Sequence, residues 1–122
     1  MANLTVQTAN PFTALNHTYA AVTTGDKFSN DGSTVLLFKN SNASARTLTL
    51  AGNAVDTPGF GSISAADMGE TITIPGSGTN GGECVVGVFP PNRFNDSAGQ
   101  VTLTLDATTG LTVAAVKLAR FA

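Results

Sequence analysis

Charged residues are scarce in this sequence. Asp, Glu, Lys and Arg supply 11% of its 122 residues, and the formal net charge is −2. An ordinary globular domain carries about 25% charged residues. The six basic residues are scattered along the chain, so they cannot form the Lys/Arg stripe that contacts the phosphates of a nucleic acid. We therefore expect no nucleic-acid partner.

Long apolar runs are also missing. The longest, residues 35–38 and 85–89, are far too short to cross a membrane as a helix. Residues 1–10 contain neither a basic residue nor an apolar stretch, so they do not resemble a secretory signal. We expect no membrane partner and no signal peptide.

Residues that carry out catalysis or bind metal ions are few. The single cysteine, Cys84, rules out an intramolecular disulfide, and together with the single histidine, His17, it falls short of a zinc site. No Gly-x-Ser-x-Gly motif offers a nucleophile to His17. Asp26 and Asp31 lie in the loop 25–32 without EF-hand spacing, which leaves an irregular calcium site as an alternative. We expect no enzyme, no catalytic residue, no metal ion and no cofactor.

Thr, Ser and Asn, by contrast, are abundant and together supply 36 residues. Apolar residues often alternate with threonine, as in 101–105. This period of two predicts strands with one apolar face, and threonine suits the other face because its β-branched side chain favours an extended backbone. Eight strands are predicted, at residues 4–7, 18–22, 34–39, 46–51, 70–74, 83–89, 101–106 and 111–119.

Short strands separated by turn residues indicate a sandwich or a barrel, and eight strands fit a jelly roll. The predicted fold class is all-β, with a single jelly-roll-like β-sandwich domain spanning residues 1–122. Turn residues at 106–110 predict a hairpin between the last two strands, and four glycines predict a flexible hairpin tip at 75–82. A single helical turn is expected within residues 62–69.

Three strands depart from simple alternation. In the last strand the apolar residues change parity after Val113, so a β-bulge near Ala114-Ala115 is predicted to return Val116 to the core. Strands 34–38 and 84–89 carry apolar residues at both parities, which is typical of strands covered on both faces. The cover is either a loop of the same chain or a neighbouring subunit.

Two further segments carry aromatic residues. Residues 1–16 are predicted to form an extended N-terminal arm. In residues 89–94 two phenylalanines flank a pair of prolines, which pre-orders the backbone, so this loop either caps the sandwich or anchors a partner. The residues predicted to contact a partner are Phe12, Leu15, Tyr19, Phe89, Pro90, Pro91 and Phe94.

Several motifs, in order along most of the chain, resemble those of small virion-associated proteins of tailed bacteriophages and prophages. The first half carries His17-Thr18-Tyr19-x-Ala21, and the second half carries Phe89-Pro90-Pro91. The remaining matching segments are residues 25–36, 39–40, 95, 99–103 and 109–118. The resemblance implies a capsid decoration (cement) protein.

A protein of that family binds the outer surface of the major capsid protein lattice, often as a homotrimer near a local threefold position. The resemblance therefore implies a homo-oligomer, made in the host cytoplasm and located on the outer capsid surface of the virion, with no catalytic residue to carry over. The low charge fits a chain that is packed against copies of itself and a shell. Two alternatives remain: another virion structural subunit in the tail or neck, or a carbohydrate-binding β-sandwich adhesin. The absence of Trp and the single Tyr weaken the adhesin.

Overall fold

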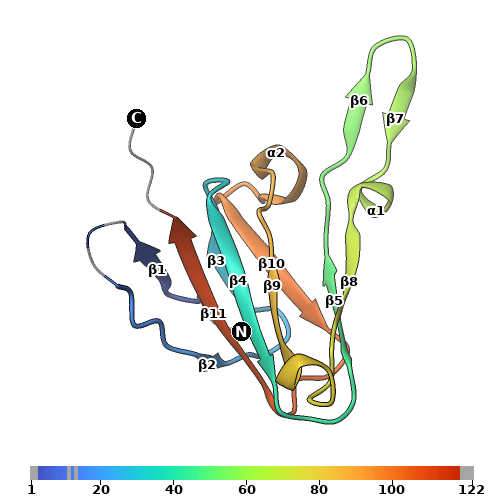
Figure 1. Cartoon of the computed structure of the whole chain (residues 1–122). Helices are drawn as coiled ribbons and strands as arrows, with labels where there is room; N and C mark the ends of the chain where they lie inside the picture. The colour runs from blue at the N-terminus through green and yellow to red at the C-terminus, as the bar shows by residue number, and fades with distance from the viewer. Residues whose placement is uncertain (1–2, 11, 13, 119–122) are drawn as a thin grey trace.

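The structure is a computed structural model that describes residues 3–10, 12 and 14–118 (Figure 1). Over these residues the chain is built almost entirely of strands, with short helical turns between some of them. The predicted all-β fold class is confirmed. The helical turn expected within residues 62–69 is also present, as α1 (Ala65–Met68).

The first sheet contains the longest strand of the described chain. Its order is β1 (Val6–Ala9), β11 (Leu111–Leu118), β4 (Thr34–Asn40) and β9 (Glu83–Val86). A short strand, β2 (Ala20–Ala21), also pairs with β11. β1 runs parallel to β11, whereas the other pairs are antiparallel.

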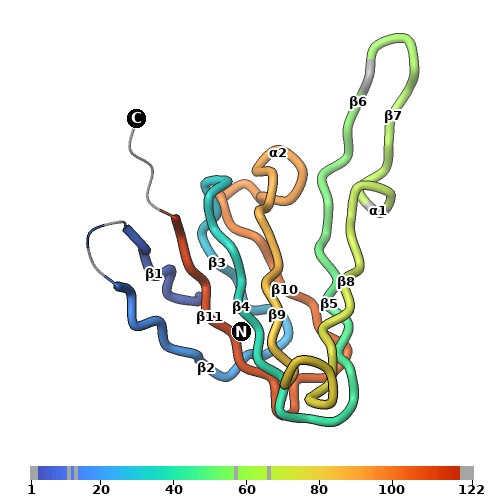
Figure 2. The backbone as a smooth tube through the Cα atoms, in the orientation of Figure 1, coloured from blue at the N-terminus to red at the C-terminus, as the bar shows by residue number. Residues whose placement is uncertain are grey.

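The second sheet is formed by β3 (Lys27–Ser29), β10 (Gln100–Leu105), β5 (Arg46–Leu50) and β8 (Glu70–Ile74), in that order, and all its pairs are antiparallel. Between β5 and β8 the chain leaves the body as a third, two-stranded sheet of β6 (Val55–Thr57) and β7 (Gly61–Ile63). We call residues 55–63 the ribbon. Figures 1 and 2 show that it projects well beyond the two main sheets.

The strand pairs are nested along the sequence. β5 pairs with β8, β4 with β9, β3 with β10 and β2 with β11, each antiparallel. The chain therefore runs out to the ribbon and back as one long hairpin. This hairpin is rolled into two sheets, because β4 also pairs with β11 and β5 with β10.

The core lies between the inner faces of the two sheets. Every second residue of β4 and of β10 is buried, as expected of strands with one face in a core. Only in β10 does the alternation of apolar residues with threonine predict this pattern. Leu36 and Phe38 of one sheet and Leu48 and Leu103 of the other are completely buried in a single apolar cluster. This continuous core holds the two sheets together as a sandwich.

The hairpins predicted at residues 75–82 and 106–110 are both wrong, because each segment connects strands of different sheets. Residues 106–110 connect β10 of the second sheet to β11 of the first, and 75–82 connect β8 to β9, again between sheets. The 75–82 segment is packed rather than a free tip, because a Cβ at Gly82 would overlap the backbone carbonyl oxygen of Asn40. Turn residues predict that the chain reverses, but not which sheet the next strand joins.

The predicted β-bulge near Ala114-Ala115 is also wrong. β11 pairs with β4 in unbroken register from Leu111, opposite Asn40, to Lys117, opposite Thr34. Ala115 belongs to the core cluster, and Val116 therefore points to the outer face, opposite Val35. The change of parity marks a strand that is buried on both faces.

The extended arm predicted over residues 1–16 is corrected in its first part. The backbone N–H of Leu4 donates to the carbonyl oxygen of Lys27 in β3, at 2.7 Å, and residues 6–9 pair with β11. Leu4 and Val6 also pack against the core. This segment bridges the two sheets because its apolar side chains are buried at the open side of the sandwich. The described residues between β1 and β2 belong to no strand of the two main sheets.

Candidate interaction surface

The Phe89–Phe94 segment is a cap of the sandwich. The ring of Phe89 is 2% exposed, and that of Phe94 is also buried. Phe89 stacks edge-to-face on Phe28 and on Phe94, with ring centroids 5.3 and 6.3 Å apart. The assignment of these two rings to a partner surface is therefore corrected, because the core contains them. Pro90 and Pro91, the latter opening α2 (Pro91–Phe94), are exposed.

Three asparagines hold this cap in place. The amide of Asn30 donates to the carbonyl oxygen of Phe89 at 2.9 Å and to Oδ1 of Asn95 at 2.7 Å. Asn53 donates to the carbonyl oxygen of Asn95 at 2.8 Å. Because buried polar groups of a loop need partners, these amides stabilise a loop that belongs to no sheet.

The second predicted contact region follows β1. Phe12 is 82% exposed, whereas Leu15 and Tyr19 are half-buried. The Gln7 side chain tethers the end of this segment, since it donates to the carbonyl oxygen of Thr18 and accepts from its N–H, both at 2.9 Å. Burial and the negative charge of Glu83 raise the pKa of the Tyr19 phenol. The segment is thus held on the sheet at Tyr19 and exposes Phe12.

The ribbon is a surface element that the sequence analysis missed. Phe60, at its tip, is 90% exposed, and Val55 and Ile63 are also exposed. In the sequence, the ribbon is indicated by the Pro58-Gly59 pair, which is typical of a tight turn. Short stretches in which apolar and polar residues alternate lie on either side of this pair. Strands of three residues are too short for such alternation to identify them.

The two faces of the ribbon differ in polarity. Val55 lies opposite Ile63 in the register, and on the other face Asp56 lies opposite Ser62. The Ser62 hydroxyl donates to Oδ1 of Asp56 at 2.8 Å. One face is therefore an apolar cross-strand pair open to solvent, and the other is a satisfied polar pair.

The outer face of the first sheet is covered unevenly. In β4, Val35 and Leu37 are half-buried on this face, and in β9 the neighbouring Val85 is 64% exposed. Val88, just beyond β9, is also exposed. The chain itself therefore covers the second face of β4 only in part, and leaves that of β9 open.

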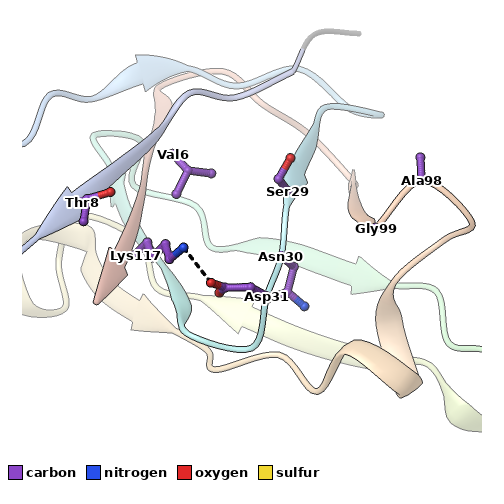
Figure 3. A pocket seen from close by; sticks show the side chains of 8 residues that line it. All are labelled: Val6, Thr8, Ser29, Asn30, Asp31, Ala98, Gly99 and Lys117. Carbon is purple, nitrogen blue, oxygen red and sulfur yellow. Dashed lines mark ion pairs between the residues drawn. The ribbon is translucent and has the colours of Figure 1, made fainter. Parts of the chain in front are cut away.

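A polar groove lies between β1, the end of β3 and the turn at Ala98-Gly99 (Figure 3). Its volume is about 430 Å³. The Lys117 ammonium and the Asp31 carboxylate form an ion pair in it at 2.8 Å, drawn as the dashed line. Asn30 bonds to the Phe89–Phe94 cap. Since these polar groups have partners within the chain, the groove contains no set of side chains that requires a ligand.

Metal-binding groups do not come together in the described part of the chain. No three His, Cys, Asp or Glu side chains of the described residues could hold a metal ion. Burial raises the pKa of the Cys84 thiol, which lowers its reactivity. His17 lies at the surface with its ring against Tyr19, centroids 5.3 Å apart. None of the helices in the described residues is long or apolar enough to span a membrane.

Comparisons with known proteins leave the family open. No family model, no curated protein and no solved structure matches this chain.

Proposed function

We propose that this chain is a structural virion protein that binds the outer surface of a bacteriophage capsid and reinforces the major capsid protein lattice. We further propose that it does so as a homo-oligomer, a trimer, and that it is not an enzyme. The proposal starts from the ordered motifs that resemble phage virion proteins. It is supported by the way the described chain distributes its apolar side chains.

The carrying observation is that the extensions of the sandwich expose aromatic rings, in addition to the open outer face at Val85 and Val88. Within the described residues, the two most exposed large apolar side chains are Phe60 on the ribbon and Phe12 after β1. Both lie outside the packed sandwich. Burying a phenylalanine side chain contributes about 1.5–3 kcal/mol, so each ring is a strong anchor once a partner covers it.

The connectivity also supports the proposal. We infer that the nested pairs and the two sheets of order β2-β11-β4-β9 and β3-β10-β5-β8 form a jelly roll. Jelly rolls occur in viral capsid proteins and in lectins. Since the fold alone does not define a function, the choice between these two rests on the surface. An exposed Phe without a polar group suits a protein contact better than a sugar.

A decoration role explains how such small contacts can be sufficient. A protein that binds only the assembled shell stabilises that shell by mass action. Many copies that contact both the shell and one another add avidity to each modest contact. We propose that Phe12, Leu15 and Tyr19 contact the capsid. The open outer face at Val85 is the surface we assign to contacts between copies of this chain.

The test is a reconstitution on particles of the encoding phage that have been assembled without this chain. Purified full-length protein is added, and its position and copy number are determined by electron cryomicroscopy. We expect density on the outer capsid surface at many equivalent positions. Density confined to the tail or neck, or no binding to the particles, would contradict the proposal.

A further inference from the structure

We propose that the ribbon docks by inserting Phe60 into an apolar pocket with a basic rim on the major capsid protein. This inference rests on the proposed function and adds to it the element that binds and the chemistry of the surface that receives it. Three features of the ribbon carry it: the fixed shape of its tip, its open apolar face and its lack of positive charge.

The tip holds Phe60 outward in a fixed turn. The turn between β6 and β7 consists of Pro58, Gly59 and Phe60, since Thr57 lies opposite Gly61 in the register. Gly59 and Gly61 have φ values of +84° and +88°, and nothing lies within 4 Å of a Cβ built on either. Glycine is therefore favoured at these two positions because it readily adopts a positive φ, and not because a larger side chain would clash with a neighbour. Pro58 restricts its own φ and in this way lowers part of the entropy cost of ordering the turn when Phe60 binds.

The ribbon also lacks a cover. A two-stranded hairpin is marginally stable by itself and needs a third strand or a packed face. The exposed Val55 and Ile63 pair is the face that such packing would bury. A partner that takes up Phe60 can cover this pair at the same time.

The charge of the region indicates which partner fits. Residues 47–92 contain no Lys, Arg or His, whereas Asp56 lies on the ribbon and Asp67 follows it in the short helix α1. Glu70 does not add to this negative charge, because it is paired with Arg93 at 2.9 Å. Anionic lipid attracts basic segments, and membrane-surface elements combine apolar side chains with Lys or Arg, neither of which occurs in residues 47–92. The acidic ribbon therefore fits an apolar pocket on a protein with basic residues at its rim.

A second copy of this chain is a poorer fit for the same reason. Lys117 is paired with Asp31 at 2.8 Å and Arg93 with Glu70 at 2.9 Å, and Lys27 lies 3.4 Å from Asp96. Arg46 donates to the carbonyl oxygen of Thr109. Since most cations of the described chain have internal partners, a different protein fits the basic rim better than a second copy does.

The experiment compares three full-length proteins on particles assembled without this chain: the wild type, Phe60→Ser and Phe60→Leu. Occupancy is titrated at low and at high salt. We expect Phe60→Ser to bind about tenfold more weakly or worse, because the free energy of burying the ring is lost. Phe60→Leu should stay within about threefold of the wild type, because it keeps an apolar anchor. Added salt should weaken wild-type binding, since the basic rim is screened.

Parallel measurements keep the outcome interpretable. The urea midpoint of Phe60→Ser should equal that of the wild type because the ring is exposed. If it does not, Phe60→Gln is used as the second polar variant. Light scattering should give the same oligomer for all variants, and neither phosphatidylglycerol vesicles nor a glycan array should bind the wild type through Phe60.

The outcomes separate the two proposals. Wild-type occupancy with equal affinity of Phe60→Ser overturns the docking role of the ribbon and leaves the decoration function standing. Failure of the wild type to bind particles overturns both. Loss of the oligomer in Phe60→Ser, or Phe60-dependent binding to vesicles or glycans, assigns the ribbon to a second copy, a lipid or a sugar and overturns the inference.

Discussion

Phe89 and Phe60 are both phenylalanines in proline-containing loops, yet they lie in opposite environments. Phe89 is 2% exposed and packs on Phe28 and Phe94, whereas Phe60 is 90% exposed at the tip of the ribbon. The difference comes from long-range hydrogen bonds: Asn30, 59 residues away in sequence, binds the carbonyl of Phe89. The aromatic rings of the Phe89–Phe94 segment therefore pack in the core of the body, whereas the ring of Phe60 is left exposed to solvent.

The largest expected difference in stability comes from replacing each of the two phenylalanines by alanine. Phe89→Ala should lower the free energy of unfolding by about 3–5 kcal/mol, because it leaves a cavity between Phe28 and Phe94. Phe60→Ala should change it by less than about 0.5 kcal/mol, because the ring has no packed neighbours to lose. Urea unfolding of the two variants beside the wild type measures both. Equal destabilisation would mean that the ribbon is part of the cooperative core.

A smaller effect is expected at the asparagine that pins the cap. Asn30→Ala should lower the free energy of unfolding by about 1–3 kcal/mol. The reason is that the carbonyl oxygen of Phe89 and the side-chain Oδ1 of Asn95 each lose the hydrogen bond donated by the Asn30 amide. Asn92→Ala, in the same cap but exposed, is the matched control and should stay within about 0.5 kcal/mol of the wild type. Chemical denaturation distinguishes them. A neutral Asn30→Ala would show that apolar packing alone holds the cap.

The smallest effect concerns acid stability. The hydrogen bond from the Lys117 ammonium, with that from the Ser33 N–H, lowers the pKa of Asp31 below its ordinary value of 3.8. A carboxylate with a lowered pKa stabilises the fold above the unfolded value, and this stabilisation is lost as the pH falls through the folded value. Since both side chains are nearly half exposed, the pair contributes at most about 1 kcal/mol.

Asp31→Asn should therefore be slightly less stable than the wild type at neutral pH. The difference should shrink as the pH falls below 3.8 and should disappear once the pH lies below the lowered pKa of the wild-type carboxylate. Urea midpoints across this range provide the measurement. A difference that persists in strong acid would indicate that the introduced amide disturbs the turn by a route other than charge.

The strands of the body could be predicted because their alternation is strong. Residues 46–51, 70–74 and 101–106 correspond to β5, β8 and β10, where threonine alternates with apolar residues. Residues 34–39 correspond to β4, which was identified by its apolar run between turn residues, since Val35 and Leu37 break the alternation. β3, β6 and β7 were missed because three residues are too few to establish a period. Phe28 is completely buried, but it lies in one of these short strands, β3.

The candidate surface could be predicted only in part. A phenylalanine in a loop looks the same in the sequence whether it caps a core or meets a partner. What decides is the long-range contact, such as Asn30 with Phe89 and Asn95, and no local pattern encodes it. Phe12 is exposed as an arm residue would be, whereas Phe89 and Phe94 belong to the core, and Phe60 was not considered.

The most direct test of the division between body and ribbon is hydrogen exchange of the full-length protein, free and bound to particles that were assembled without it. We predict that amides of residues 55–63 exchange quickly in the free protein, because a two-stranded hairpin is marginally stable, and at least about tenfold more slowly when bound. Amides of β4 and β10 should be slow in both states. Unchanged exchange of residues 55–63 at full occupancy of the particles would contradict the account.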